Sequence, residues 1–188
     1  MKRSVFLALA MMLLPSLWYG LNANRFSVST NLLDYARLGT LNVDASYAAS
    51  RHWSIVAGAR YNPFTFNADN PDRQFQYRQQ SYAVGARWWL WHTWSGWWFS
   101  GKARYQEYNA GGLGKKETEE GDRVGAGLYV GYTHMLGPHW NMEFGMGFWG
   151  GIAWYTGYSC PSCGKIVDEG QKYFVRPDDL MISIVYVF

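Results

Sequence analysis

The sequence lacks a strong charge of either sign and, beyond its first twenty-odd residues, any long apolar run. Its formal net charge is only +3 over 188 residues, and the charged residues are dispersed, which excludes a typical basic nucleic-acid-binding protein. No later apolar run approaches the roughly 20 residues that a membrane-spanning helix needs. Proline and cysteine are also scarce, with 6 and 2 residues.

Aromatic residues and glycine are abundant instead. Aromatic residues make up 19% of the chain, including 11 Trp and 14 Tyr, and there are 21 Gly. The mean hydropathy is nevertheless −0.25, so apolar and polar residues must be finely interleaved. This combination is typical of a β protein with many turns and aromatic belts, and it disfavours a helical bundle.

The N-terminus has the pattern of a secretory signal. Two basic residues precede an apolar run at 5–18, which contains Pro15 and is followed by small residues. The alternative, a membrane anchor, needs a longer run than this one. We therefore predict a cleaved signal peptide over residues 1–23 and one exported domain over residues 24–188.

An alternation of apolar and polar residues recurs eight times after the signal, which predicts eight strands. The alternating segments lie at 26–32, 41–47, 53–61, 82–90, 97–105, 124–132, 140–148 and 180–188. Short turns alternate with long polar connections at 62–80, 106–122 and 155–178. This order predicts an all-β fold, an eight-stranded antiparallel up-and-down transmembrane β-barrel with its long loops outside the cell.

The polar set of these strands decides which face points outward. It combines many glycines with a few charged residues, which we predict to form a charge network in the lumen: Asp44, Arg60, Arg87, Lys102, Arg104, Arg123 and Glu143. A soluble barrel would place this set in water, where glycine only weakens strands. A narrow lumen needs small residues to make room for long ones, so we expect the apolar set to face outer-membrane lipid.

The ends of the strands carry aromatic residues. The tryptophans near the short turns predict a girdle at the periplasmic interface: Trp53, Trp91, Trp94, Trp97 and Trp140. The last strand ends on Phe188, with Tyr186 two residues before it. This ending resembles the signal by which the barrel-assembly machinery recognises outer-membrane proteins, so we expect that machinery to be a partner.

The two cysteines, Cys160 and Cys163, fall in the longest predicted loop. Two cysteines outside the cytoplasm most simply form a disulfide. Half of a tetrahedral zinc site shared with a partner chain, free thiols and a redox role remain alternatives. One chain cannot complete such a site here, so we expect no metal and no cofactor.

Several stretches in order resemble a family of small outer-membrane barrels from the Bacteroidetes phylum whose molecular role is unassigned. They are STNLLDYARLGTLNVDASY at 29–47, YNPFTF at 61–66, GARWWL at 85–90, YQEYNAGGL at 105–113, YSCPSCGK at 158–165 and YFVRPDDLMISIVYVF at 173–188. Members of that family are often encoded beside fimbrial anchoring and assembly proteins. The resemblance therefore implies a structural or binding role in fimbrial assembly.

Three function hypotheses follow. The first is a structural or surface-binding role in the outer membrane, with a protein partner at the long loops. The second is a narrow channel with a weak anion preference, since Arg60, Arg104 and Arg123 are expected near the outer mouth. The third, a lipid-modifying enzyme, is disfavoured because no serine lies in register with His134, the one lipid-side histidine.

Overall fold

A computed structural model of the chain describes residues 24–67, 74–112, 117–160 and 164–188. The predicted signal peptide, residues 1–23, lies outside the described residues. The strands are β1 (Phe26–Asn31), β2 (Leu41–Ala48), β3 (Trp53–Asn62), β4 (Thr65–Phe66), β5 (Phe75–Trp89), β6 (Gly96–Gly111), β7 (Thr118–Met135), β8 (Trp140–Tyr158) and β9 (Ile166–Val187). One short helix, α2 (Leu32–Ala36), interrupts them. Within the described ranges, no helix has the length and apolar character needed to cross a bilayer.

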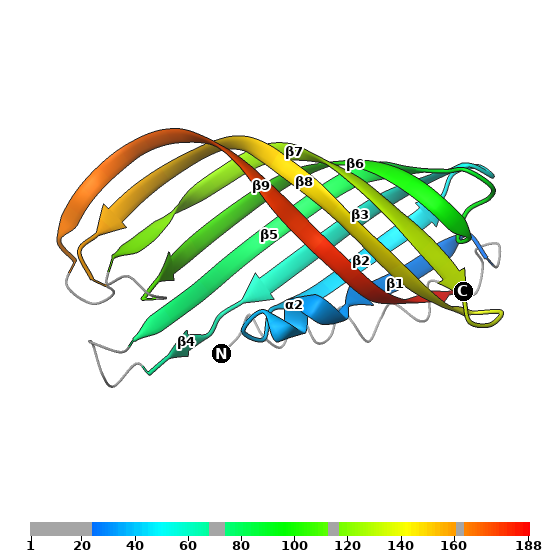
Figure 1. Cartoon of the computed structure of the whole chain (residues 1–188), viewed down its shortest axis with the longest axis horizontal. Helices are drawn as coiled ribbons and strands as arrows, with labels where there is room; N and C mark the ends of the chain where they lie inside the picture. The colour runs from blue at the N-terminus through cyan, green and yellow to red at the C-terminus, as the bar shows by residue number, and fades with distance from the viewer. Residues whose placement is uncertain (1–23, 68–73, 113–116, 161–163) are drawn as a thin grey trace, which may run out of the picture.

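The strands form one antiparallel sheet that closes on itself (Figure 1). Its order is β3-β2-β1-β9-β8-β7-β6-β5-β4, and β3 also pairs with β5. The two residues of β4 only extend the pairing along β5. The barrel therefore has eight strands connected in sequence order, which confirms the predicted eight-stranded antiparallel fold.

The register shows that the strands are strongly tilted. Pairing traced from Val28 across β2, β3, β5, β6, β7 and β8 reaches Val175 on β9. Val28 itself pairs with Tyr186, much further along the same strand. Such a stagger is required to close a sheet, and an eight-stranded barrel is just wide enough for its own side chains.

Large apolar side chains cover the outside of the barrel, and the inward positions hold polar residues together with a group of tryptophans. Along β6, exposed and buried residues alternate from Gly96 to Tyr108. Trp97 and Phe99 are each 48% exposed on the outside, whereas Lys102 is 4% exposed on the inside. This arrangement is the reverse of a soluble barrel, in which the apolar set fills the interior.

The walls of the barrel differ in height. The short wall consists of β1, β2 and β3, and the tall wall consists of β5 to β9 (Figure 1). At about 3.3 Å per residue, the 22 residues of β9 extend for about 70 Å and the 6 residues of β1 for about 20 Å. The tall wall therefore projects well beyond the end of the short wall.

The long loops predicted at 62–80, 106–122 and 155–178 are wrong in extent. β5 already begins at Phe75, β6 continues to Gly111, and β9 begins at Ile166. These polar segments pair with each other through their backbones and through side chains such as Asn109 and Glu120 (2.9 Å). They were mistaken for loops because strands with water on both faces need no apolar alternation.

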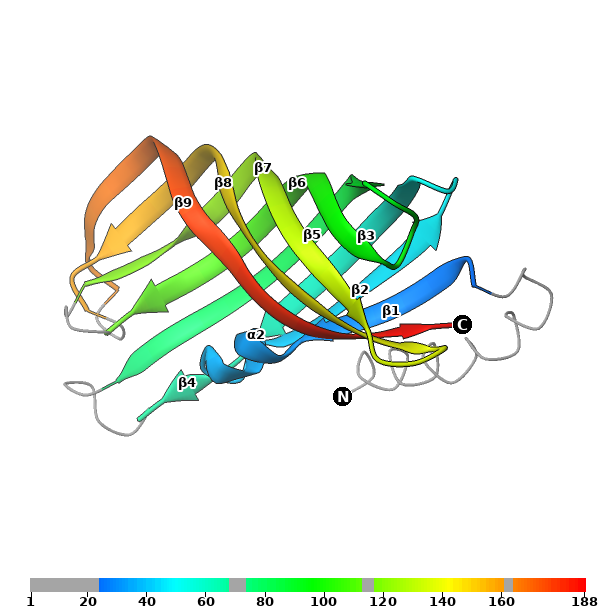
Figure 2. The same cartoon turned by 45° about the vertical axis from the view of Figure 1, so that its right-hand side comes forward.

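Helix α2 was not predicted and begins where β1 ends. The side chain of Asn31 caps the helix by accepting a hydrogen bond from the Leu33 amide (3.2 Å). The same side chain accepts from the Ile182 amide (3.1 Å) and donates to the Leu180 carbonyl (3.3 Å), which ends the pairing of β1 with β9. α2 then packs against β9 and β2, at the end of β1 that points away from the C-terminus (Figure 2).

Candidate functional site

The lumen is the part of the molecule where polar, charged and aromatic side chains converge. We call the end near the turns at 49–52, 90–95 and 136–139 the lower lumen, and the opposite half the upper lumen. Both chain ends described here, Asn24 and Phe188, also lie at the lower end, where the Asn24 amide donates to the Phe188 carbonyl.

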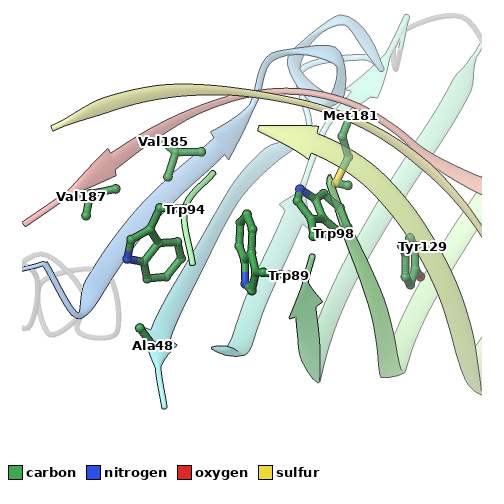
Figure 3. Packing of buried hydrophobic residues seen from close by; sticks show 8 residues of the cluster. All are labelled: Ala48, Trp89, Trp94, Trp98, Tyr129, Met181, Val185 and Val187. Carbon is green, nitrogen blue, oxygen red and sulfur yellow. The ribbon is translucent and has the colours of Figure 1, made fainter. Parts of the chain in front are cut away.

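Tryptophans fill the lower lumen (Figure 3). Trp89 and Trp98 are both fully buried, with ring centroids 6.3 Å apart, and Trp94 lies 5.7 Å from Trp89. They are surrounded by the rest of this buried cluster, namely Ala48, Tyr129, Met181, Val185 and Val187. We call these residues the tryptophan cluster. They close the lower lumen with packed rings and methyl groups.

The position of Trp94 corrects the predicted girdle. Trp94 is 7% exposed and turns into the barrel, where its indole N–H donates to the Asn24 carbonyl (3.0 Å). Its φ of 71° is uncommon for a residue other than glycine. Its backbone carbonyl accepts from the Asn141 amide group (3.1 Å), so both ends of the residue are held in place.

A buried ion pair lies directly against the tryptophan cluster. One guanidinium nitrogen of Arg87 donates to both carboxylate oxygens of Glu143, at 2.9 and 3.0 Å. Thr133 also donates to Glu143 (3.1 Å) and accepts from the Trp98 indole (3.2 Å). Glu143 is 1% exposed, and the Arg87 guanidinium stacks over Trp98 at 4.4 Å. Two predicted network residues are therefore brought together in a buried ion pair, although the Nε of Arg87 has no hydrogen-bond partner among the described residues.

Asp44 and Arg60, also predicted for the network, do not pair with each other in the described contacts. The carboxylate of Asp44 lies over Gly58, where an added Cβ would approach its Oδ1 to 1.7 Å. Arg60 donates to Asp34 of α2 at 2.7 Å. Asp34 is buried and was not predicted as a lumen residue; the Asn31 cap three residues before it was the available signal.

The other predicted lumen cations lie over aromatic rings. The pairs are Lys102 over Tyr129 at 4.9 Å, Arg104 over Trp149 at 5.0 Å and Arg123 over Tyr108 at 3.4 Å. A ring face attracts a cation without adding a negative charge. These aromatic partners were not predicted, although each occupies an inward position that otherwise holds polar residues.

A cavity of about 350 Å³ lies in the upper lumen, and we call it the upper chamber. Its charged lining residues are Arg37, Arg60, Arg104, Arg176 and Asp34. Its other lining residues include Gln79, Gln106, Ser81, Tyr77 and Trp149. The described lining thus carries four guanidinium groups and one carboxylate.

A wider, open cavity of about 1180 Å³ runs along the tall wall, and we call it the wall groove. Its charged lining residues are Arg78, Glu107, Glu120, Asp122 and Glu169. The register places the four carboxylates on the same outward face as Tyr105 and Trp154, because Glu107 pairs with Asp122 and Asp122 pairs with Trp154. Arginine therefore predominates among the charged residues described around the upper chamber, and carboxylates predominate among those described around the wall groove.

A family model matches this chain over residues 7–188, and it describes proteins of unknown function under the designation DUF3575. The chain belongs to the DUF3575 family. The comparison with curated proteins finds no match. The family description assigns no activity, so any function of this DUF3575 protein must be argued from its own residues.

Above the upper chamber, Glu119 joins three strands of the DUF3575 barrel. Its carboxylate accepts from Tyr108 of β6 and from Lys172 of β9, both at 2.5 Å, and lies 3.5 Å from Arg123. Burial alone would raise the pKa of Glu119, but the bonds from Lys172 and Tyr108 and the nearby cations lower it overall. Burial and the bond to Glu119 raise the pKa of Tyr108 to about 12.

Cys160 follows β8 at the far end of the tall wall, and Cys163 lies outside the described residues. The predicted disulfide, and the metal half-site that was its alternative, therefore stay predictions. In the part of the chain that the structure describes, no group of three or more His, Cys, Asp or Glu residues is arranged to hold a metal ion.

The C-terminal residues of this DUF3575 protein lie at the seam that closes the barrel. The Phe188 amide donates to the Phe26 carbonyl (3.0 Å). Tyr186 packs edge-on against Trp140 and Phe188, with ring centroids 5.0 and 4.9 Å apart. The two residues thus cover the lower outer rim, and their recognition by the assembly machinery stays a prediction.

Proposed function

We propose that this protein is an outer-membrane β-barrel whose tall wall binds a protein partner at the cell surface. The apolar outer face supports the membrane part of the proposal. Leu128 is 78% exposed and Phe148 60% exposed at the middle of their strands. Monomeric soluble proteins rarely expose apolar patches of such extent, whereas lipid would cover them in a transmembrane barrel.

The aromatic residues at the lower rim support the same placement. Trp53, Trp91, Trp97 and Trp140 are each about half exposed on the outside of this rim. Tryptophan is enriched at membrane interfaces, where its ring is buried and its N–H stays hydrated. In this orientation the short turns and the mature termini are periplasmic, and the tall wall extends outside the cell.

The proposed binding of a partner at the cell surface rests on the wall groove. Glu107 and Glu169 are exposed along it, Glu120 and Asp122 are half-buried, and Arg78 is its cation. Hydrogen bonds hold the carboxylates in place: Tyr105 donates to Asp122 (2.9 Å) and Tyr158 to Glu120 (2.6 Å). A fixed acidic surface flanked by aromatic rings fits a basic segment of a partner protein.

The sequence resemblance to a Bacteroidetes barrel family suggests what the partner does. Members of that family are often encoded beside fimbrial anchoring and assembly proteins, so we propose that the partner belongs to a surface fimbria. The proposed role is binding rather than catalysis. Insertion through the barrel-assembly machinery, after removal of residues 1–23, is part of the same proposal.

Fractionation and protease accessibility test the membrane part. We expect the protein in the outer-membrane fraction, with heat-modifiable migration in gels, which reports a closed barrel. Protease added to intact cells should cut the tall wall and leave the lower rim protected. A monodisperse protein in plain buffer without detergent would contradict the proposal.

Titration with defined peptides tests the binding part. The full chain in zwitterionic micelles should bind a Lys- and Tyr-containing octapeptide and not its Glu- and Tyr-containing counterpart. The E107Q/E120Q variant should bind the basic peptide at least about a hundredfold more weakly, because charge-assisted hydrogen bonds contribute roughly 1.5–3 kcal/mol each. E117Q is the matched control, since Glu117 is exposed on the same wall but does not line the groove. Equal losses in both variants would contradict the role of the groove.

The channel hypothesis finds less support in the packing of the lumen. The upper chamber offers a cationic mouth, but the Arg87–Glu143 pair and the tryptophan cluster fill the section below it. Passage of an ion would require these buried groups to separate. We therefore expect no steady conductance in planar bilayers.

A further inference from the structure

We propose that the outer part of β9 is a docking edge, to which an extended segment of a partner protein adds as a further β-strand. The side of β9 that faces away from β8 pairs with β1 only from Ser183 onward. Over residues 166–176, which we call the free edge, no strand among the described residues pairs with this side of β9 (Figure 1). This inference deepens the surface-binding role and rests on its membrane placement, but it uses the edge of the tall wall and not the wall groove.

The backbone of the free edge is a template for one more strand. Alternate residues of a strand direct their N–H and C=O groups to opposite sides, so about half of the residues of the free edge turn both groups away from β8. These groups can be hydrated by water or bonded by another strand. When an extended peptide adds to a sheet edge, main-chain hydrogen bonds provide the affinity and alternate side chains provide the specificity.

The neighbouring edges of the sheet are covered. On the opposite side of the tall wall, β3 and β4 pair with β5 as far as Phe75, the first residue of that strand. Lower on β9, the side chain of Asn31 accepts from the Ile182 amide and donates to the Leu180 carbonyl, and α2 packs beside them. Natural proteins protect sheet edges with such covering elements. Within the described ranges, the free edge has no covering element of this kind.

The free edge begins where the outer membrane ends in the proposed placement. Tyr186 lies at the lower rim. At about 3.3 Å per residue and a strand tilt of about 40°, Val175 lies about 28 Å above it. The apolar band of such barrels is about 25 Å tall. The covered part of the β9 edge therefore lies within the bilayer, where lipid-exposed sheet edges do not occur, and the free edge lies in water, where a partner can reach it.

The side chains of the free edge select the kind of segment. Phe174 packs against Trp149 inside the barrel, so its neighbours Tyr173 and Val175 lie on the outer face, where they are 82% and 80% exposed. Arg176 is exposed and has no ion pair in the described contacts. Apolar pairs and pairs of opposite charge across two strands stabilise a sheet. The fitting segment therefore carries β-branched residues opposite Tyr173 and Val175 and a carboxylate opposite Arg176.

A second copy of this chain does not fit the free edge within the same membrane. Antiparallel pairing of two β9 strands requires a two-fold axis perpendicular to the sheet, which would turn the second barrel upside down. Parallel pairing requires a two-fold axis along β9. Because β9 is tilted by about 40° from the membrane normal, the second barrel would then be tilted by about 80°. The geometry therefore favours a segment of a different protein.

Titration of strand peptides against the full chain in zwitterionic micelles tests the inference. The peptide alternates Thr and Val and carries Glu opposite Arg176 in antiparallel pairing. Two N-methylated isomers carry methyl groups on alternate amides, so that each isomer blocks one edge of the added strand. We expect one isomer to bind like the unmethylated peptide and the other to bind at least about tenfold more weakly, because several backbone hydrogen bonds are lost. An equal effect of both isomers would overturn the inference.

Hydrogen exchange of the β9 amides locates the bound peptide. Every second amide of the free edge should become protected, because the amides between them already bond to β8. Protection of residues in the wall groove alone would overturn the inference. Protection of the free edge without peptide, rising with protein concentration, would assign the edge to a second copy and would also overturn it.

Charge reversal tests the predicted ion pair. R176E should weaken binding of the peptide about two- to fivefold, as expected for one exposed ion pair, and a peptide with Lys in place of Glu should restore the affinity. R78E is the matched control, because Arg78 is exposed on the same wall but lies on β5. Heat-modifiable gel migration verifies that each variant forms a closed barrel, and an equal loss in R78E would contradict the assignment to the free edge.

The two peptide probes separate this inference from the proposed function. If the strand peptide does not bind while the basic octapeptide still binds at the wall groove, the free edge is not a docking site and the proposed function stands. If the strand peptide binds and the octapeptide does not, the role of the wall groove is contradicted and the docking edge stands.

Discussion

The lower and the upper lumen use the same alternating strands for opposite purposes. In the lower lumen, Arg87 donates to the carboxylate of Glu143. Beside this pair, the indole of Trp98 from the tryptophan cluster donates to Thr133. In the upper lumen, Arg104 lies over a ring and faces a cavity. A carboxylate neutralises the charge of an arginine, whereas the face of a ring packs against the guanidinium group and positions it. The comparison indicates that the lower lumen is a structural seal, whereas the upper lumen keeps a cavity of about 350 Å³.

Breaking the lower ion pair should have the largest effect on stability. E143Q keeps the shape of the side chain but leaves Arg87 charged and buried. Removal of one partner of a buried pair costs about 3–5 kcal/mol. We expect a loss of this size in the free energy of unfolding, measured in urea by tryptophan fluorescence.

Two further variants sharpen this test. E107Q removes an exposed carboxylate that accepts only from Tyr105 in the described contacts (3.0 Å), and it should change the free energy of unfolding by less than about 0.5 kcal/mol. The R87M/E143M variant should lose less than E143Q, because it buries no unpaired charge. If the double variant is less stable than E143Q, the ion pair contributes more to the free energy of unfolding than the mutual compensation of two buried charges.

The second prediction tests how tightly the short wall packs inside the barrel. In G58A the new Cβ would collide with the Asp44 carboxylate, which must then move. Overpacking of this kind costs about 1–3 kcal/mol. D44A alone should have a smaller effect, and D44A/G58A should recover most of the loss. If D44A/G58A does not recover stability, position 58 requires glycine because of its backbone surroundings and not because of the Asp44 side chain.

The membrane-facing parts of the strands were predictable, because their outer face is apolar and their inward positions include glycine, charged residues and other polar residues. The alternation in β6 from Trp97 to Tyr105 follows this rule closely. Above Gln106 both faces are polar, so the sequence no longer distinguishes a strand from a loop. The extensions of the tall wall therefore became visible only through their pairing.

The sequence predicted which residues point into the lumen better than it predicted which of them contact each other there. The parity of the strands identifies Arg104 as inward, but its ring partner Trp149 comes from β8, which is not adjacent to β6. Which inward residues meet across the barrel depends on tilt and stagger, and these follow from the closed register. For the same reason, Asp34 could not be assigned to Arg60 before α2 was seen.

The third prediction links the cap of α2 to the upper chamber. N31A removes the acceptor for the Leu33 amide and should cost about 0.5–2 kcal/mol, the usual range for an N-cap. Because α2 carries Asp34, which holds Arg60 at 2.7 Å, we also expect looser positioning of Arg60. N31D keeps an acceptor at the cap but not the donor to Leu180. Recovery of the free energy of unfolding in N31D would assign the effect to the cap, and a loss equal to that of N31A would assign it to the seam with β9.

The smallest expected effect is a pH dependence of the upper tall wall. Tyr108 has its pKa raised from 10.0 to about 12, so its contribution to stability is fully present below pH 10 and is lost as the pH rises through 12. Glu119 has its pKa lowered, so its contribution is present above the ordinary glutamate pKa and is lost as the pH falls through the lowered value. Hydrogen exchange of the amides in β6, β7 and β9 should therefore show faster local opening at both extremes than near neutrality. Y108F should remove the alkaline slope and keep the acidic one, because Lys172 still binds Glu119. An unchanged alkaline slope in Y108F would assign that slope to other groups, and the network around Glu119 would then not couple the three strands as the contacts indicate.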